Sequence, residues 1–281
     1  MKRILITGAN SYIGTSFEKY INENYPHDYT VDTIDMIDGS WRKKSFSGYD
    51  SVFHVAGIAH QKETKKNADL YYQVNRDIAI QAAEKAKADG VGQFIFLSSM
   101  SVYGMDTGVI TSQTNPNPKS HYGKSKWQAE QAIEDIADSN FKVCILRPPM
   151  VYGDGCKGNF QTVVKIVKKI PIFPNVKNER SMIYIDNLSS FVKWCIECNA
   201  SGIYFPQNKE YMSTKNMALW ISEALHKKIY FEYITGFGVR IMRHIHPMAK
   251  KAFGSLIYDI EADSEYCIVS ESDSVKKSVN L

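Results

Sequence analysis

Residues 4–14 read ILITGANSYIG, in which a strand-like apolar run leads through a glycine turn into a helix-like segment. Gly8 allows a tight turn after the strand, and Gly14 allows the helix to pack closely against it. The N–H groups at the start of such a helix, together with the helix dipole, suit a pyrophosphate. This stretch therefore predicts a strand–turn–helix unit that binds a dinucleotide.

The glycine pattern departs from the usual spacing at its middle position, where Ser11 replaces a glycine. A Cβ at this point crowds the approach of a phosphate to the backbone. We therefore expect the dinucleotide to bind in a slightly shifted position or with lower affinity, but still at this site.

Strand-like runs alternate with helix-like segments along the chain. Helical spacing marks residues 68–89 and 122–138. The strand-like runs lie at residues 3–7, 31–35, 51–57, 93–98, 142–147 and 202–205. Several of them are nearly continuous in apolar residues, as in strands buried on both faces. This alternation predicts an α/β fold with a doubly wound parallel sheet.

The composition is that of a globular protein. The 281 residues include 34 Lys and Arg against 30 Asp and Glu, a net charge of +4 without a long block of one sign, which does not favour a nucleic-acid partner. No apolar run approaches the ~18 residues that cross a bilayer, so no integral membrane segment is expected. Scattered cysteines predict reduced thiols in a cytoplasmic protein, at positions 144, 156, 195, 198 and 267.

Prolines and glycines between residues 148 and 174 predict loops through which the chain leaves the sheet and enters another layer of the structure. We expect a dinucleotide-binding domain over residues 1–158 and a smaller domain mainly over residues 159–270, with residues 181–206 returning to the first. The polar residues 271–281 are predicted to form a tail. A basic and apolar stretch predicts a helix of the smaller domain at residues 238–253.

The choice of dinucleotide depends on an acidic residue about 20 positions beyond the glycine turn. Asp35 ends the second strand-like run, and a carboxylate there accepts hydrogen bonds from a ribose hydroxyl and repels a 2′-phosphate. Asp35 therefore favours NAD over NADP, with Asp32 and Asp38 as alternatives. NADP stays open, because only about 16 positions separate Asp35 from the next strand and the second strand–helix unit is truncated.

Several segments together carry a family resemblance: TGANSYIG (7–14), FHVAG (53–57), FIFLSSMSVYG (94–104), YGKSK (122–126) and LRPPMVYGDG (146–155). In this order they resemble the extended short-chain dehydrogenase/reductase family, the nucleotide-sugar epimerase/dehydratase group. The resemblance covers roughly residues 1–200. It implies a Rossmann domain with a smaller C-terminal substrate-binding cap.

The resemblance identifies Tyr122 and Lys126 as the catalytic pair. Four residues apart on a helix, the two side chains share one face. A neighbouring ammonium and the nicotinamide cation favour the phenolate, so we expect the pKa of Tyr122 to fall below the usual value of about 10. The family implies that Tyr122 exchanges a proton with a sugar oxygen, that Lys126 also holds the nicotinamide ribose, and that Ser99 bonds the reacting oxygen. Ser98 is the alternative to Ser99.

The resemblance also implies which residues hold the cofactor. They come from the glycine turn, the ends of strand-like runs, one helix start and the catalytic pair, namely Gly8, Asn10, Ser11, Tyr12, Ile13, Gly14, Asp35, Val55, Ala56, Gly57, Asn75, Tyr122, Lys126 and Pro148. Besides Ser99, two residues match positions that contact a substrate diphosphate: Asn159 and Arg180. A guanidinium suits a diphosphate because its planar fork donates paired hydrogen bonds. No metal ligand set is expected.

The match is strongest to a subgroup of capsule and O-antigen proteins, through residues 146–161 and 170–188. This subgroup implies an NAD(P)-dependent enzyme acting at C4 of a nucleoside-diphosphate sugar, with UDP as the expected nucleotide. Met100 and Ser101 stand where 4,6-dehydratases of the family place Asp and Glu, which argues against dehydration. We expect reduction of a UDP-4-keto-6-deoxy-N-acetylhexosamine, with a UDP-sugar 4-epimerase as the alternative. A homodimer would be usual for the family.

Overall fold

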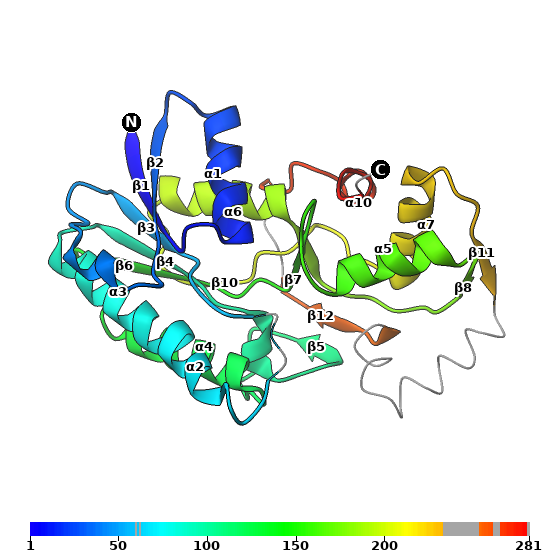
Figure 1. Cartoon of the computed structure of the whole chain (residues 1–281), viewed down its shortest axis with the longest axis horizontal. Helices are drawn as coiled ribbons and strands as arrows, with labels where there is room; N and C mark the ends of the chain where they lie inside the picture. Colours follow the sequence, from blue (N-terminus) through cyan, green and yellow to red (C-terminus); the bar gives the residue numbers. More distant parts are fainter. Residues whose placement is uncertain (60, 62, 233–252, 261–264, 280–281) are drawn as a thin grey trace. The chain divides into compact units, whose positions relative to one another are not determined.

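The computed structural model describes residues 1–59, 61, 63–232, 253–260 and 265–279 (Figure 1). The predicted helix at residues 238–253 lies outside these residues except for Phe253. Within the part of the chain that is described, no helix is both long and apolar enough to span a membrane.

A parallel sheet of six strands draws its strands from residues 2–146 and 202–204 (Figure 1). Its strands stand in the order β10-β6-β4-β3-β1-β2, and every neighbouring pair is parallel. Their bounds are β1 (Lys2–Thr7), β2 (Tyr29–Ile34), β3 (Ser51–His54), β4 (Gln93–Leu97), β6 (Lys142–Leu146) and β10 (Gly202–Tyr204). The predicted doubly wound parallel fold is confirmed.

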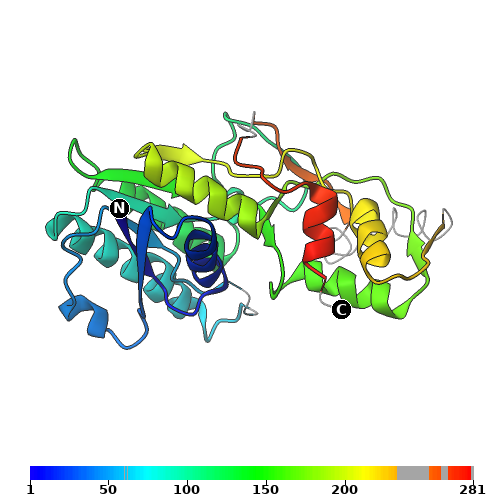
Figure 2. The ribbon, with the colours of Figure 1, turned by 90° about the horizontal axis from the view of Figure 1, so that it is seen from above.

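Helices cover both faces of this sheet (Figures 1 and 2). One face carries α3 (Ile78–Ala88) and α4 (His121–Glu134), and the other carries α1 (Tyr12–Asn24) and α6 (Ile185–Glu197). Because both faces are covered, the side chains that point to either face of the sheet are buried. This explains the nearly continuous apolar runs in the sequence.

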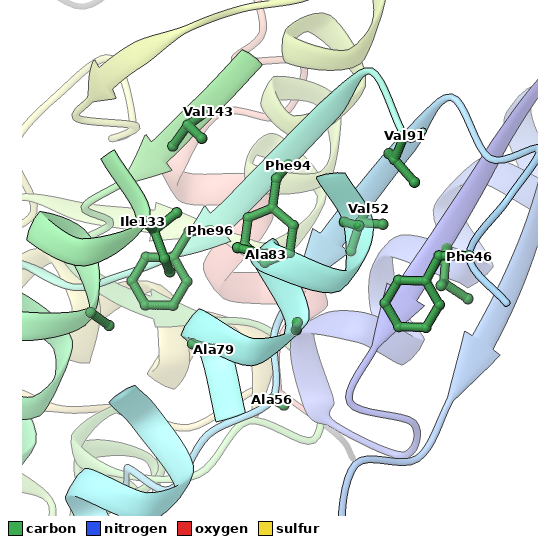
Figure 3. Packing of buried hydrophobic residues seen from close by; sticks show 14 of the residues in the cluster. Phe46, Val52, Ala56, Ala79, Ala83, Val91, Phe94, Phe96, Ile133 and Val143 are labelled. Carbon is green, nitrogen blue, oxygen red and sulfur yellow. The ribbon is translucent and has the colours of Figure 1, made fainter. Parts of the chain in front are cut away.

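The core on the α3 and α4 face interlocks large strand residues with small helix residues. Phe94 and Phe96 of β4 pack there against alanines of α3, among them Ala79 and Ala83 (Figure 3). All four side chains are fully buried. The alanines let the helix lie close to the sheet, so the phenylalanine rings fill the space between them.

The predicted helix over residues 68–89 is continuous but not uniform. It consists of α2 (Ala68–Tyr72), a π-helical turn at Gln73–Asp77, and α3. The π turn inserts one extra residue per turn and places Asn75 in the interior. Simple 3.6-residue periodicity could not reveal this insertion.

The connection after β2 is short, and the strand order on either side of it indicates where a ligand would bind. Only a short 3-10 helix, η1 (Ser40–Lys43), lies between β2 and β3. β2 and β3 pair with opposite edges of β1, so the strand order reverses between β1 and β3. In open α/β sheets, ligands bind beyond the carboxyl ends of the strands at such a reversal.

The chain divides into two compact units, each formed from separated segments. The first comprises residues 1–104, 115–148 and 188–206, and the second comprises residues 105–114, 149–187 and 207–281. The predicted boundary at residue 158 therefore lies about ten residues too late, because β7 pairs with β9 of the second unit. The predicted return near 181–206 corresponds to the segment 188–206.

The second unit contains three two-stranded parallel pairs and several helices. The pairs are β7 (Met150–Tyr152) with β9 (Met182–Tyr184), β8 (Ile172–Pro174) with β11 (Tyr230–Glu232), and β5 (Gly108–Ile110) with β12 (Leu256–Tyr258). The helices are α5 (Asn159–Lys169), α7 (Thr214–Ala224) and α10 (Glu271–Lys277).

The predicted polar tail is wrong over residues 271–277, which form α10. Ser270 caps this helix, Val275 is fully buried, and the Ser274 hydroxyl lies 2.6 Å from the Tyr152 hydroxyl. The segment attaches through one apolar side chain and small hydroxyl groups, so it lacks the apolar stripe that would have marked it in the sequence.

Candidate active site

Helix α4 presents Tyr122 and Lys126 one turn apart on the same face. The helix starts at a serine cap, where the Ser120 Oγ accepts a hydrogen bond from the Gly123 N–H over 3.0 Å. Lys126 is buried, and its Nζ donates to the Leu97 carbonyl at the end of β4 over 2.8 Å. The Lys126 ammonium also lies 4.6 Å from the centre of the Phe96 ring.

Ser99 lies near Tyr122 at the end of β4. Its hydroxyl is hydrogen-bonded to the Tyr122 side chain, and it caps the short helix η3 (Met100–Tyr103) through the Ser101 N–H. Ser98, the alternative, instead donates its hydroxyl to the Glu130 carboxylate. The structure thus brings Ser99 and Tyr122 together and assigns Ser98 to the interior.

Burial shifts the pKa values of Tyr122 and Lys126 in opposite directions. Burial raises the pKa of Tyr122, and the Ser99 hydrogen bond offsets only part of that effect. Burial also lowers the pKa of Lys126 to about 8, against the opposing influence of Glu130. The direction found for the pKa of Tyr122 is opposite to the expected lowering, because loss of water around the hydroxyl outweighs the Ser99 hydrogen bond. The expected contribution of the nicotinamide cation stays a prediction. Tyr122 carries its proton at neutral pH.

Glu130, one turn beyond Lys126 on α4, forms a buried ion pair with Arg147, which follows β6. The Arg147 Nη2 is 2.6 Å from the Glu130 Oε2, and the two side chains are only 5% and 1% exposed. The Arg147 Nη1 also donates to the Tyr103 hydroxyl over 2.8 Å. Sequence reasoning missed Glu130, although its place four residues after Lys126 on an apolar helix face was the available signal.

His54, at the end of β3, is a second group that sequence reasoning missed. It is fully buried, and its Nδ1 lies 2.8 Å from the Thr7 hydroxyl, whereas its Nε2 has no hydrogen-bond partner. Burial and the nearby Lys126 lower the pKa of His54 to about 3. The imidazole is therefore neutral at working pH and leaves Lys126 as the cation of this region.

The glycine turn closes tightly over the ends of β2 and β3. Gly8 and Ala9 both donate their N–H groups to the Ile34 carbonyl, over 2.9 and 3.1 Å. Gly8 has φ +116°, and a Cβ there would lie 2.7 Å from the Ala56 nitrogen. Ser11 caps α1 by accepting the Gly14 N–H over 3.2 Å, so its side chain is used within the turn.

We expect Gly8→Ala to destabilise the protein by more than about 1–3 kcal/mol, because the left-handed backbone strain is joined by a backbone clash at Ala56. Gly90→Ala is the matched control, since Gly90 has φ +81° with nothing within 4 Å of an added Cβ. Denaturant unfolding of both variants measures the difference. Equal losses at the two positions would contradict a close approach at Gly8.

Each of the three acidic candidates after the turn accepts a hydrogen bond. Asp32 accepts the Tyr49 hydroxyl over 2.8 Å, and Asp38 accepts the Ser40 N–H over 2.9 Å. Asp35 accepts the Ile37 N–H with one carboxylate oxygen, and it alone of the three is exposed directly after β2. Its position beside the Gly8 turn is the one that a ribose-binding carboxylate requires.

The loop after β3 is fixed to its surroundings by Asn75. Both ends of the Asn75 amide bond the Ile58 backbone, at 2.8 and 3.1 Å, and its Nδ2 also donates to Ser125. A Cβ on Gly57 would lie 3.0 Å from the Asn75 Oδ1 and 3.4 Å from the Lys126 Nζ. The amide of Asn75 thus holds the start of this loop beside α4.

The remaining predicted residues are placed as follows. Val55 and Ala56 donate their N–H groups to the Thr7 carbonyl, so the end of β3 stays joined to β1. Pro148 follows β6, and its carbonyl accepts the Met100 N–H over 2.9 Å. Asn10 adopts φ +64° in the glycine turn, while Tyr12 and Ile13 open α1.

The two predicted diphosphate contacts belong to the second unit. Asn159 is exposed at the first position of α5. The Arg180 Nη1 donates to the Gly254 carbonyl over 2.9 Å, and burial lowers the pKa of Arg180 against the influence of Asp106.

Comparison with known proteins adds a family match and two sequence relatives. The model of the NAD dependent epimerase/dehydratase family matches residues 4–204. A UDP-glucose 4-epimerase of Vibrio cholerae is 30% identical over 253 residues, covering 80% of this chain and 76% of the relative. An N-acetyl-α-D-glucosaminyl-diphospho-ditrans,octacis-undecaprenol 4-epimerase of Escherichia coli O157:H7 is 27% identical over 80% of this chain and 73% of the relative.

Solved structures share the fold over nearly the whole chain. A UDP-glucuronic acid 4-epimerase of Bacillus cereus in complex with NAD has a TM-score of 0.75 at 20% identity, covering 98% of this chain and 94% of the other. A dTDP-4-dehydrorhamnose reductase of Clostridium acetobutylicum has a TM-score of 0.74 at 20% identity, covering 98% of each chain.

Proposed function

The chain belongs to the NAD dependent epimerase/dehydratase family, and we propose on this basis that it acts at C4 of a UDP-linked sugar, reducing a 4-keto-6-deoxy-N-acetylhexosamine for surface polysaccharide synthesis. The observation that carries reduction is the protonated Tyr122 hydroxyl bonded to Ser99. A carbonyl that accepts hydride develops negative charge and needs a proton donor. The family resemblance seen in the sequence motifs is confirmed.

The residues of the first unit fit a nicotinamide dinucleotide. The Gly8 turn, where a Cβ would meet the Ala56 backbone, and the start of α1 suit a pyrophosphate. Asp35 suits the ribose hydroxyls of NAD better than the 2′-phosphate of NADP. When bound, the nicotinamide supplies the hydride chemistry.

The chain's own side chains manage the proton and the position of the sugar. Tyr122 holds the proton that the C4 oxygen takes as it becomes a hydroxyl, and Ser99 orients that oxygen by a second hydrogen bond. Lys126, fixed by the Leu97 carbonyl, provides positive charge beneath the site and a donor for the nicotinamide ribose. Asn159 and Arg180 are proposed to bind the diphosphate of the substrate.

The second candidate function is 4-epimerisation of an intact UDP-sugar, which the names of the two sequence relatives favour. The same residues would serve, but Tyr122 would first have to take a proton from the C4 hydroxyl. The raised pKa of Tyr122 suits a proton donor better than a proton acceptor. A cytoplasmic homodimer completes the proposal.

The test mixes purified protein with NADH or NADPH and UDP-2-acetamido-2,6-dideoxy-4-ketohexose and follows nicotinamide absorbance, with Tyr122→Phe as the control. Stoichiometric cofactor oxidation that the variant lacks is the expected result, faster with NADH than with NADPH. No net oxidation, with NAD⁺ recovered from the denatured protein, would overturn reduction of this sugar and favour 4-epimerisation.

A further inference from the structure

Glu63 connects the loop after β3 to the catalytic helix. Its carboxylate accepts the His121 N–H with Oε2 and the Tyr122 N–H with Oε1, each over 3.0 Å. Glu63 lies 58 and 59 positions from these residues, so the contact is tertiary and does not arise from a local cap.

These two bonds complete the start of α4. The first four N–H groups of a helix have no partner within the helix. At the start of α4 the Gly123 N–H is taken by the Ser120 side chain over 3.0 Å, and the Lys124 N–H makes the first regular helical bond, to the Ser120 carbonyl, over 2.9 Å. Glu63 takes the N–H groups of His121 and Tyr122, and Tyr122 carries the hydroxyl that is proposed to react.

The loop around Glu63 is held on both sides. The Tyr71 hydroxyl of α2 donates to the Gln61 carbonyl over 2.9 Å. The Asn67 side chain accepts the Thr64 N–H over 2.7 Å. Toward the start of the loop, Asn75 fixes Ile58, as described above. The described residues on either side of Glu63 in sequence, Gln61 and Thr64, are therefore each held by a hydrogen bond.

We propose that Glu63 is a positioning residue for the reaction, which fixes Tyr122 through its backbone and ties it to the loop that follows β3. This inference rests on the proposed function, because that function makes Tyr122 the proton donor. Glu63 acts on the peptide nitrogens of the helix start, whereas Ser99 acts on the tyrosine side chain.

From general electrostatics we expect the Glu63 carboxylate also to influence the pKa of Tyr122. A carboxylate at the start of a helix offsets the positive end of the helix dipole, which would otherwise stabilise a phenolate. Among the described residues, Ser99 before η3 and Tyr71 on α2 act on the pKa of Tyr122, and His121 and Lys126 lie on the same helix. Loss of the Glu63 charge should therefore lower the pKa of Tyr122.

The first measurement is amide hydrogen exchange of the resting protein, which requires no substrate. Glu63→Gln keeps the side-chain shape but removes the charge and one acceptor oxygen, and Glu63→Ala removes both acceptors. We expect peptides covering residues 119–126 to exchange faster by about tenfold in Glu63→Ala and less in Glu63→Gln. Glu134→Gln, an exposed carboxylate at the other end of α4, is the matched control and should leave this exchange unchanged.

The second measurement is the pH profile of turnover. In Glu63→Gln we expect kcat to fall about tenfold with KM within about twofold, and the basic limb to move to lower pH, because Tyr122 must hold its proton. Unchanged exchange would overturn the contact itself. Faster exchange with an unmoved pH profile and kcat would reduce Glu63 to a structural role. If the wild type has no activity on the sugar, the proposed function fails while the exchange result still stands.

Discussion

Replacing Tyr122 by phenylalanine should lower kcat for reduction of the 4-keto sugar by about 10²–10⁴-fold, the usual contribution of a positioned proton donor. The variant removes the hydroxyl that Ser99 bonds and leaves the ring in place. Because most of the residues proposed to hold the cofactor, and both residues proposed to hold the substrate diphosphate, are unchanged, KM should change little. Steady-state kinetics with NADH and the keto sugar measure both parameters.

The matched control for this variant is Tyr204→Phe. Tyr204 lies in β10 at the edge of the same sheet, and its hydroxyl donates to the Ser201 carbonyl over 3.2 Å. It should keep wild-type kinetics. A Tyr122→Phe enzyme that retained more than about a tenth of wild-type kcat would remove Tyr122 from the proton-donor role.

Breaking the buried pair of Glu130 and Arg147 should have the largest effect on stability. Glu130→Gln leaves the Arg147 guanidinium without its counter-charge in the interior, which costs about 3–5 kcal/mol in comparable buried pairs. The free energy of unfolding from denaturant titration measures the loss. Replacing both partners, as Glu130→Leu with Arg147→Met, should recover much of it, because no charge then stays buried.

The matched control is a solvent-exposed ion pair with a similar distance between its charged atoms. Lys276 and Glu223 lie 2.8 Å apart with 41% and 45% of their side chains exposed. Lys276→Met should cost no more than about 1 kcal/mol, since surface pairs contribute little. A loss for Glu130→Gln as small as that for Lys276→Met would show that the buried pair does not support the fold.

The sheet could be predicted from sequence because its physical signal is local. Each central strand is buried on both faces, so apolar runs such as residues 93–98 mark it without reference to the rest of the chain. The second unit gave no such signal. Its strands have three residues each and pair across long separations, as in β5 with β12, so neither periodicity nor length revealed them.

The candidate site was predictable to the extent that its motifs occupy short segments. The Tyr122 and Lys126 spacing and the Gly8 turn follow from one helix and one turn. Glu63 and Glu130 were missed because their partners come from other elements, at the start of α4 and the end of β6. The direction of the tyrosine pKa was also missed, since burial is a property of the assembled fold.

The order of the segments has a consequence for synthesis on the ribosome. The last strand of the central sheet, β10, becomes available only after residues 149–187 of the second unit have been made. A nascent chain that ends before residue 202 exposes the open edge of β6, with unpaired N–H and C=O groups that invite pairing with another chain. Because its segments alternate along the chain, neither unit can be obtained by a single cut. Until β10 is made, the open edge of β6 makes the emerging protein prone to aggregation, and chaperones would have to shield that edge.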